Sequence, residues 1–260
     1  MSEPREVLAV IPARGGSKSI PRKNVKRLAG VPLLAYSIAA ARQSELVTRV
    51  LLTTDDPEIR EVGRQWGAEA PFLRPPALAL DEVPDLPVFQ HVLDWLLENE
   101  SYRPDIVVQL RPTSPFRPKG LVDQAIAALI HDQEADSVRA VCAPAQNPYK
   151  MWRPEGPYLR PLLSDAGREG HNSPRQGLPP LLWQTGQVDA TRPETILLKG
   201  SMTGEKVRGV VVDPSYAVDL DTKPQWSLAE ILATSGALDI IHPDRAPSPP
   251  EGTPELPRQL

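Results

Sequence analysis

The sequence predicts a three-layer α/β fold, in which a parallel sheet is covered by helices on both faces. Short β-branched runs alternate with segments whose apolar residues recur at helical spacing. Consecutive parallel strands need crossover connections, and helices supply these connections. The chain has 260 residues and can bury one large core without disulfides, so we expect a single domain over residues 1–242.

Most of the predicted elements lie in the first part of the chain. Four apolar runs predict strands at 7–11, 50–53, 106–110 and 138–143. Apolar residues recur at helical spacing between and after these strands, and they predict helices at 32–42, from 57 onward, around 88–96 and at 121–129. Asp56 followed by Pro57 is typical of a helix start, because aspartate is a favoured N-cap and proline a favoured first residue.

The second part of the chain is less regular. Residues 146–193 are rich in proline, glycine and arginine and show no clean period. A loop of this length is uncommon inside a compact domain, so we interpret it as an inserted lobe or an oligomer arm. Regular structure resumes with a strand at 210–212 and a helix near 225–233. Residues 243–260 hold six prolines and no aromatic residue, which predicts a disordered tail.

Composition excludes several classes of protein. The chain has 29 basic and 33 acidic residues, a net charge of −4, which argues against a nucleic-acid or anionic-membrane surface. The charge-free stretch 28–41 is too short to span a bilayer, and the first residues lack a secretory signal pattern. Cys142 is the only cysteine, so an intramolecular disulfide and a thiolate zinc cluster are excluded. We therefore expect a cytoplasmic protein.

The loop after the first predicted strand is a candidate phosphate-binding site. Six basic residues and no acidic residue lie between positions 14 and 27. Ligands of open α/β sheets bind beyond the carboxyl ends of the strands, where this loop begins. Gly15 and Gly16 allow backbone amides to approach a phosphate, and Arg14, Lys18 and Lys23 can neutralise a triphosphate. The alternative is a solvated basic loop, and the spacing of a Walker loop is absent.

Asp219 and Asp221 form a candidate metal site. Alternation along a short extended segment places both carboxylates on the same side. Paired carboxylates suit Mg²⁺, which keeps several waters and substrate phosphate oxygens in its coordination shell. The alternative is that Asp221 caps the helix whose start is indicated by residues 222–224.

Four motifs together resemble the acylneuraminate cytidylyltransferases, also called CMP-sialic acid synthetases. They are Ile-Pro-Ala-Arg-Gly-Gly-Ser-Lys at 11–18, Arg-Pro-Thr-Ser-Pro-Phe-Arg at 111–117, Ser-Pro-Arg-Gln at 173–176 and Asp-Leu-Asp-Thr at 219–222. The resemblance covers roughly residues 6–235. It implies a Rossmann-like nucleotidyltransferase fold, CTP as donor, Mg²⁺ as cofactor and an acidic sugar as acceptor. It also implies a homodimer whose lobe at 146–193 reaches the neighbouring active site.

The same resemblance implies roles for individual residues. Catalytic roles are expected for Arg14, Lys18, Lys23 and Asp221, and metal binding for Asp219 and Asp221. Nucleotide contacts are expected from Ala13, Arg14, Gly15, Gly16, Ser17, Lys18, Lys23, Asn24 and, on the cytosine side, Arg74. The acidic sugar is expected to contact Arg111, Lys150, Arg175 and Gln187. The general base stays open between a metal-activated hydroxyl and Asp221.

The sequence departs from the family pattern mainly on the acceptor side. Arg111 stands where a glutamine is common, and residues 185–189 read Thr-Gly-Gln-Val-Asp where the family has Asn-Gly-Ala-Ile-Tyr. Positions 83–85 lack the expected small residues. Because Arg111 adds a charge and Asp189 adds an opposing one, we expect a rebuilt acceptor pocket. A sialic-acid-like 2-keto acid, a deoxy-octulosonate and a phosphonate stay open as acceptors. A nucleotide-binding module without turnover is the alternative from another class.

Overall fold

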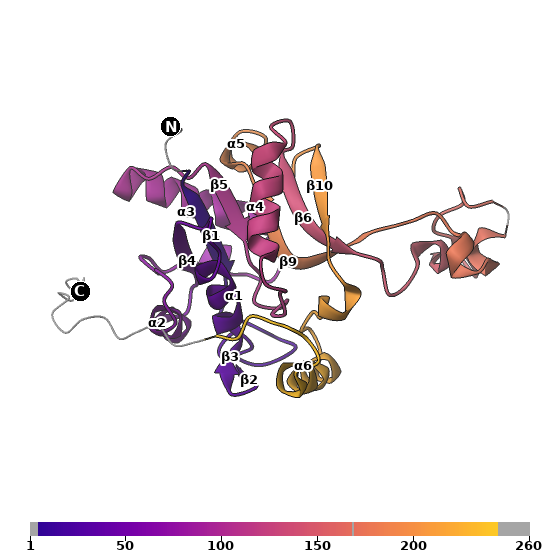
Figure 1. Ribbon diagram of the computed structural model, residues 1–260, viewed down its shortest axis with the longest axis horizontal. Helices are drawn as coiled ribbons and strands as arrows, with labels where there is room; N and C mark the ends of the chain where they lie inside the picture. The colour runs from indigo at the N-terminus through magenta and orange to yellow at the C-terminus, as the bar shows by residue number, and fades with distance from the viewer. Residues whose placement is uncertain (1–4, 168, 244–260) are drawn as a thin grey trace.

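A computed structural model describes residues 5–167 and 169–243 and contains a six-stranded sheet between two layers of helices (Figure 1). The strand order is β10-β6-β9-β5-β1-β4. Five strands run in the same direction: β1 (Val7–Pro12), β4 (Arg49–Thr53), β5 (Ile106–Gln109), β6 (Ser137–Cys142) and β10 (Val207–Val211). The predicted three-layer α/β fold is confirmed.

The strand β9 (Trp183–Thr191) corrects the prediction of an all-parallel sheet. It lies between β5 and β6 and pairs antiparallel with both. It also falls inside the stretch that we interpreted as irregular, although residues 185–191 alternate polar residues with small or apolar ones. Thr185, Gln187 and Asp189 are nevertheless buried, and each makes hydrogen bonds to the chain around it. Hydrogen bonding reduces the cost of burying these polar groups.

Helices cover both faces of the sheet. One face carries α1 (Leu33–Arg42), α2 (Pro57–Gln65) and α4 (Leu121–His131), and the other carries α3 (Asp85–Glu100) and the short α5 (Pro193–Leu197). Alternate residues of β1 belong to the two resulting cores: Val7, Ala9 and Ile11 to the first, Leu8 and Val10 to the second. An interior parallel strand is buried on both faces, which explains its continuous apolar sequence.

A third core joins the basic loop to the C-terminal helix α6 (Lys223–Ser235). Ile20 and Leu28 of the loop region pack with Leu220 and Trp226. The loop ends in a small hairpin, β2 (Arg27–Leu28) and β3 (Val31–Pro32). This packing brings the segment 219–221 next to the basic loop, although about 200 residues separate them in the sequence.

Thr222, and not Asp221, caps α6. The Thr222 hydroxyl accepts a hydrogen bond from the Gln225 amide, and the Gln225 side chain accepts from the Thr222 amide at 2.7 Å. This reciprocal capping box satisfies the first amides of the helix. The alternative in which Asp221 serves as the cap is therefore wrong, and its carboxylate is left for other contacts.

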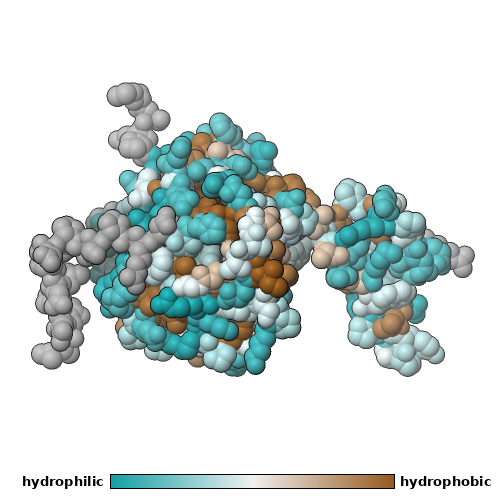
Figure 2. Space-filling model, turned by 60° about the horizontal axis from the view of Figure 1, so that its bottom comes forward, coloured by the Kyte–Doolittle hydropathy of each residue, from teal (hydrophilic) through white to brown (hydrophobic). Residues whose placement is uncertain are grey.

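Residues 144–182 form a lobe that stands away from the sheet (Figure 1). It holds the hairpin β7 (Trp152–Glu155) and β8 (Tyr158–Pro161) and three short 3₁₀ helices, η2 (Pro148–Lys150), η3 (Gly170–Asn172) and η4 (Arg175–Gly177). Figure 2 shows the lobe as a separate projection. Its exposed apolar side chains are Met151, Trp152, Tyr158, Leu159, Leu162 and Leu182.

Two further short 3₁₀ helices are η1 (Pro76–Leu78) and η5 (Pro214–Tyr216). The tail predicted at 243–260 lies, beyond Pro243, outside the described residues. In the part of the chain that the structure describes, no helix has the length and apolarity needed to cross a membrane.

Asp56 begins α2 as predicted, accepting hydrogen bonds from the amides of Glu58 (2.9 Å) and Ile59 (3.0 Å). It also pairs with Arg22 of the basic loop. We expect Asp56→Ala to lower the free energy of unfolding by about 1–2 kcal/mol in urea denaturation, because the helix loses its cap. Glu61→Ala, an exposed change on the same helix, should change it by less than about 0.5 kcal/mol. Equal losses in the two variants would contradict the capping role.

Candidate active site

A pocket of about 480 Å³ opens at the carboxyl ends of β1 and β5. The basic loop forms one side, and the start of α3 and the residues after β5 form the other. The pocket brings together eight of the predicted site residues, which are Arg14, Ser17, Lys18, Lys23, Asn24, Arg74, Arg111 and Asp221. Its position agrees with the general location of ligand sites in open α/β sheets.

A second pocket, of about 450 Å³, lies near the opposite end of β5 and contains none of the predicted site residues. Arg192 on its wall donates to the backbone carbonyls of Leu129, Asp132 and Ala135. Because these bonds use much of its donor capacity, Arg192 has a structural role. We therefore assign the chemistry to the first pocket.

Lys23 links the basic loop to the aspartate pair. Its side chain is 10% exposed, and Nζ donates to the Leu220 carbonyl at 2.9 Å and to Asp221 Oδ1 at 3.0 Å. The Asp221 side chain is 62% exposed and lines the pocket. Asn24 fixes the loop from within, because its Nδ2 donates to the Arg14 carbonyl at 2.9 Å. The loop and the aspartate segment, predicted separately, thus form one site.

Asp219 has the environment expected of a cation ligand. Its Oδ1 atom is buried and has no hydrogen-bond partner among the described residues. Burial, followed by the charge of Asp221, raises the pKa of the Asp219 carboxyl. A buried carboxylate oxygen without a donor is costly unless a cation or a proton compensates it, so the residues present fit a divalent ion.

The two aspartates are the candidate protein ligands of such a cation. Within residues 5–167 and 169–243, no group of three histidine, cysteine or acidic side chains could hold a metal ion. A cation held by Asp219 and Asp221 would take its other ligands from water and from phosphate oxygens. Mg²⁺ is commonly bound in this way, by one or two carboxylates together with substrate phosphates.

Two predicted nucleotide contacts, Gly15 and Ala13, have backbone amides that are hydrogen-bonded within the protein, and neither residue lines the pocket. The Gly15 amide donates to Asp55 Oδ1 at 2.9 Å, so it is engaged within the protein. A Cβ atom at Gly15 would lie 2.9 Å from Asp56 Oδ2, which shows that glycine is needed for close approach to α2. Ala13 is buried, and its amide donates to the Thr53 carbonyl at 3.0 Å. Gly16 has open space around its Cβ position.

Arg74 lines the pocket but is itself buried. It donates from Nη2 to the Thr53 carbonyl at 2.6 Å and from Nε to Thr53 Oγ1 at 3.2 Å. Burial lowers the pKa of its guanidinium to about 10. These bonds hold Arg74 against the end of β4 and place a rigid donor on the pocket wall.

Asp81 is a pocket residue that the sequence analysis missed. Its carboxylate pairs with Arg14 Nη1 at 2.5 Å and with Lys18. The hydrogen bond from Lys18, followed by that from Arg14, lowers the pKa of the Asp81 carboxyl. Two of the cations expected to bind a triphosphate are therefore already paired with an anion of the protein. No spacing in the sequence connects position 81 with position 14, so only the folded chain reveals this contact.

We expect Asp81→Asn to lower the KM for the nucleoside triphosphate about 3- to 10-fold, because the ligand phosphates no longer compete with the aspartate for Arg14 and Lys18. Steady-state kinetics at fixed low salt would measure the change. Glu82→Gln, an exposed neighbour that does not line this pocket, is the matched control and should leave KM within about twofold. A KM that rises in Asp81→Asn would contradict the competition.

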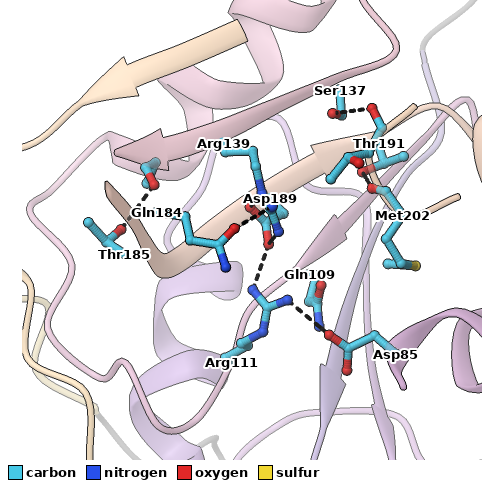
Figure 3. Close-up of polar contacts among 12 residues, drawn as sticks. Asp85, Gln109, Arg111, Ser137, Arg139, Gln184, Thr185, Asp189, Thr191 and Met202 are labelled. Atoms are coloured by element: carbon cyan, nitrogen blue, oxygen red, sulfur yellow. Dashed lines mark hydrogen bonds and ion pairs between the residues drawn. The ribbon is translucent and has the colours of Figure 1, made fainter. Parts of the chain in front are cut away.

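Arg111, predicted to contact the sugar, lines the pocket and forms an ion pair with Asp189 at 2.6 Å (Figure 3). Its Nη2 also donates to Asp85 Oδ2, at 2.9 Å. Arg111 and Asp189 both depart from the family pattern, and their opposite charges predicted a rebuilt acceptor pocket. Asp85 was noted only as a missing small residue, and its contact with Arg111 is a finding of the structure.

Three predicted acceptor-site residues lie outside the pocket. Gln187 is fully buried and donates to the carbonyls of Phe116 and Tyr216, so its prediction as a substrate ligand is wrong. Strand β9 is buried on both faces, so the Gln187 side chain lies in the protein interior and not in the pocket. Arg175 donates to the carbonyls of Pro144 and Ala145, and Lys150 is exposed on η2. Both belong to the lobe and do not line the pocket of their own chain.

A family model described as Cytidylyltransferase matches residues 8–149, a range that contains the basic loop, Arg74, Asp85 and Arg111. The chain belongs to this family. It is a CTP-dependent nucleotidyltransferase of the acylneuraminate cytidylyltransferase type, as the sequence motifs implied.

Curated relatives agree with this assignment. The chain is 32% identical over 232 residues to CMP-N,N'-diacetyllegionaminic acid synthase of Legionella pneumophila, a match covering 87% of this chain and 95% of the relative. It is 40% identical over 126 residues to pseudaminic acid cytidylyltransferase of Campylobacter jejuni, covering 48% and 54%. It is 29% identical over 226 residues to N-acylneuraminate cytidylyltransferase of Escherichia coli, covering 86% and 51%.

Solved structures share the fold. CMP:2-keto-3-deoxy-manno-octonic acid synthetase complexed with CTP matches with a TM-score of 0.64 at 16% identity, over 89% of this chain and 99% of that one. The 4-diphosphocytidyl-2C-methyl-D-erythritolsynthase of Anaerococcus prevotii matches with a TM-score of 0.57 at 12% identity, over the same shares. The family model and these structures together place the chain in the α/β nucleotidyltransferases.

Proposed function

We propose that this cytidylyltransferase activates a nonulosonic acid, a nine-carbon 2-keto sugar acid, by transferring CMP from CTP to its anomeric hydroxyl. The hydroxyl oxygen forms a bond to the α-phosphorus, the bond to the bridging oxygen breaks, and pyrophosphate leaves. The observation that carries the proposal is the contact of Lys23 of the basic loop with Asp221, in a pocket that both residues line. The names of the relatives, which include legionaminic, pseudaminic and neuraminic acid enzymes, support the acceptor class.

The basic residues of the pocket would contact different parts of CTP. Arg14 and Lys18, once released from Asp81, can hold the phosphates that leave as pyrophosphate. Lys23 is fixed between Leu220 and Asp221 and can stabilise negative charge at the α-phosphate. Such preorganised cations act at the transition state without reorganising, and positioning adds to their effect. Arg74 offers a rigid donor for the base.

The proposal includes Mg²⁺ as cofactor, which Asp219 and Asp221 would hold. When bound, the ion would neutralise phosphate charge and orient the triphosphate. The unpartnered oxygen of Asp219 and the exposed carboxylate of Asp221 support this assignment. Magnesium dependence is measured by titrating the ion against pyrophosphate release after treatment with a chelator.

The test of the function is pyrophosphate release from CTP with a panel of sugar acids. We expect release with CTP and a nonulosonic acid, much less with ATP, and none without an acceptor. Mass spectrometry should detect the CMP-sugar. Equal release from CTP and ATP, or no release with any sugar acid, would refute the proposal. Release only with a deoxy-octulosonate or a phosphonate would favour the alternative acceptors, and CTP binding without turnover would favour a binding module.

We also propose that the enzyme is a homodimer in which the lobe 144–182 contacts the partner. The lobe exposes Trp152 and Tyr158, with exposed fractions of 43% and 73%, which is costly for large aromatic side chains unless a surface covers them. Lys150 and Arg175 lie on this lobe, outside their own pocket, and could serve the partner's site. Sedimentation velocity of wild type and of Trp152→Ser/Tyr158→Ser would test this, with a shift from dimer to monomer expected in the variant.

A further inference from the structure

Four charged side chains form a chain of contacts that begins in the pocket lining, with Asp85 and Arg111, and continues into the sheet through Asp189 and Arg139 (Figure 3). Arg111 lies between two carboxylates, since Nη1 donates to Asp189 Oδ2 at 2.6 Å and Nη2 to Asp85 Oδ2 at 2.9 Å. Arg139 holds Asp189 from the other side, with Nε to Oδ1 at 2.7 Å and Nη2 to Oδ2 at 3.0 Å. The order of the contacts is Asp85, Arg111, Asp189, Arg139.

The sheet fixes this arrangement. Asp189 of β9 stands opposite Gln109 of β5 and Arg139 of β6 in the strand register, so the three side chains lie on one face. Gln109 donates to the same Asp85 oxygen as Arg111, at 2.8 Å. The Asp189 side chain is only 5% exposed and accepts three hydrogen bonds from two arginines. These contacts all lie within the protein, and Asp189 does not line the pocket.

Arg111 differs from Asp189, because it reaches the pocket. Two of the five N–H groups of its guanidinium are used by the carboxylates, which leaves donors for a ligand. Its charge, however, lies between the carboxylates of Asp85 and Asp189, and together with Arg139 the four side chains carry no net charge. A third carboxylate placed on Arg111 would meet both of these anions at short range, whereas an amide carbonyl would gain a hydrogen bond without that repulsion.

We propose that Asp189, held by Arg139, is a positioning residue that fixes Arg111 as a charge-compensated donor, and that Arg111 binds an N-acyl carbonyl of the sugar rather than its carboxylate. The proposal rests on the proposed acceptor class, and it adds which group of the acceptor Arg111 recognises. Arg111 is the specificity-determining residue, and Asp189 acts through it.

The first experiment compares acceptors that share a carboxylate and an anomeric hydroxyl. Wild type and Arg111→Gln are assayed with an N-acylated nonulosonic acid and with analogues in which each acetamido group is replaced in turn by a hydroxyl. We expect one replacement to lower kcat/KM at least about 10-fold in wild type and less than about threefold in Arg111→Gln. Equal losses from Arg111→Gln on every acceptor would overturn the proposal, because the contact would then be to a shared group.

The second experiment tests positioning. We expect Asp189→Asn to raise the KM for the sugar acid at least about 10-fold, to leave the KM for CTP within about twofold, and to add little to Arg111→Gln in the double variant. Arg139→Gln tests the same link if the buried change prevents folding. A purely structural role, with both KM values moved equally or with additive effects, would overturn the positioning role.

Failure of the function and failure of this inference are distinguishable. Wild-type pyrophosphate release with a sugar acid tests the function alone, before any variant is made. Binding of the acceptor to wild type and to Arg111→Gln by calorimetry requires no turnover. Equal affinity of both proteins for the N-acylated acid would overturn the inference even in an active enzyme.

Discussion

Lys23→Met is expected to lower kcat for CMP transfer about 100-fold, with a smaller effect on the KM for CTP. The Lys23 ammonium is nearly buried and is fixed by the Leu220 carbonyl and Asp221, so it is held in place before the substrate arrives. A preorganised group of this kind stabilises charge that develops in the transition state, and removing one such group costs about 10²- to 10³-fold in rate. Stopped-time assays of pyrophosphate at saturating CTP and acceptor would measure it.

Lys26→Met is the matched control. Lys26 belongs to the same loop, but its Nζ lies over the ring of Trp226, 4.3 Å from the centroid, and it does not line the pocket. The control removes the same charge from the same loop and should leave kcat within about twofold. Lys23→Arg should retain more activity than Lys23→Met, since the charge is kept. Equal rates in Lys23→Met and wild type, with both folded, would remove Lys23 from the site.

The sequence was sufficient for most of the fold because most elements carry a local signal. The runs at β1 and β5 are continuous and apolar, as burial on both faces requires, and Asp56–Pro57 marks the start of α2. Strand β9 carries a different signal, since residues 185–191 alternate polar residues with small or apolar ones, a pattern typical of a half-exposed strand. Its polar residues are nevertheless buried, because partners distant in the sequence satisfy them, among them Arg139 for Asp189. Tertiary contacts therefore decide that both faces of β9 are buried, and the alternation does not reveal it.

The candidate site divides in the same way. The cations of the basic loop and the aspartate pair could be found from charge and spacing, and the structure brings the loop and Asp221 together through Lys23, whereas Asp219 does not line the pocket. The contacts of Asp81 and Asp85 could not, because each carboxylate meets its cations only after the chain folds. Gln187 shows the opposite error. The resemblance to the family predicted that Gln187 contacts the sugar, but its side chain is buried and donates to the Phe116 carbonyl.

Asp219→Asn is expected to lower activity at least about 10-fold and to raise the concentration of Mg²⁺ needed for half-maximal rate, because a neutral amide oxygen binds a hard cation more weakly than a carboxylate. Magnesium titration of pyrophosphate release would measure both. Asp213→Asn provides a matched control, since the carboxylate of this aspartate accepts from the Ser215 amide at the start of η5 and is not a predicted cation ligand. A variant with unchanged rate and unchanged magnesium dependence would exclude Asp219 as a ligand.

The same substitution should stabilise the protein when no metal is present. Burial and the nearby Asp221 raise the pKa of Asp219 above the ordinary value of 3.8, so the folded chain holds this proton more tightly than the unfolded chain does. The contribution of this group to stability is fully present below 3.8 and is lost as the pH rises through the raised pKa. At pH 8 with a chelator, Asp219→Asn should therefore unfold at a Tm a few degrees above wild type, and the difference should shrink toward pH 4. A lower Tm at pH 8 would show that the carboxylate serves the fold rather than a ligand.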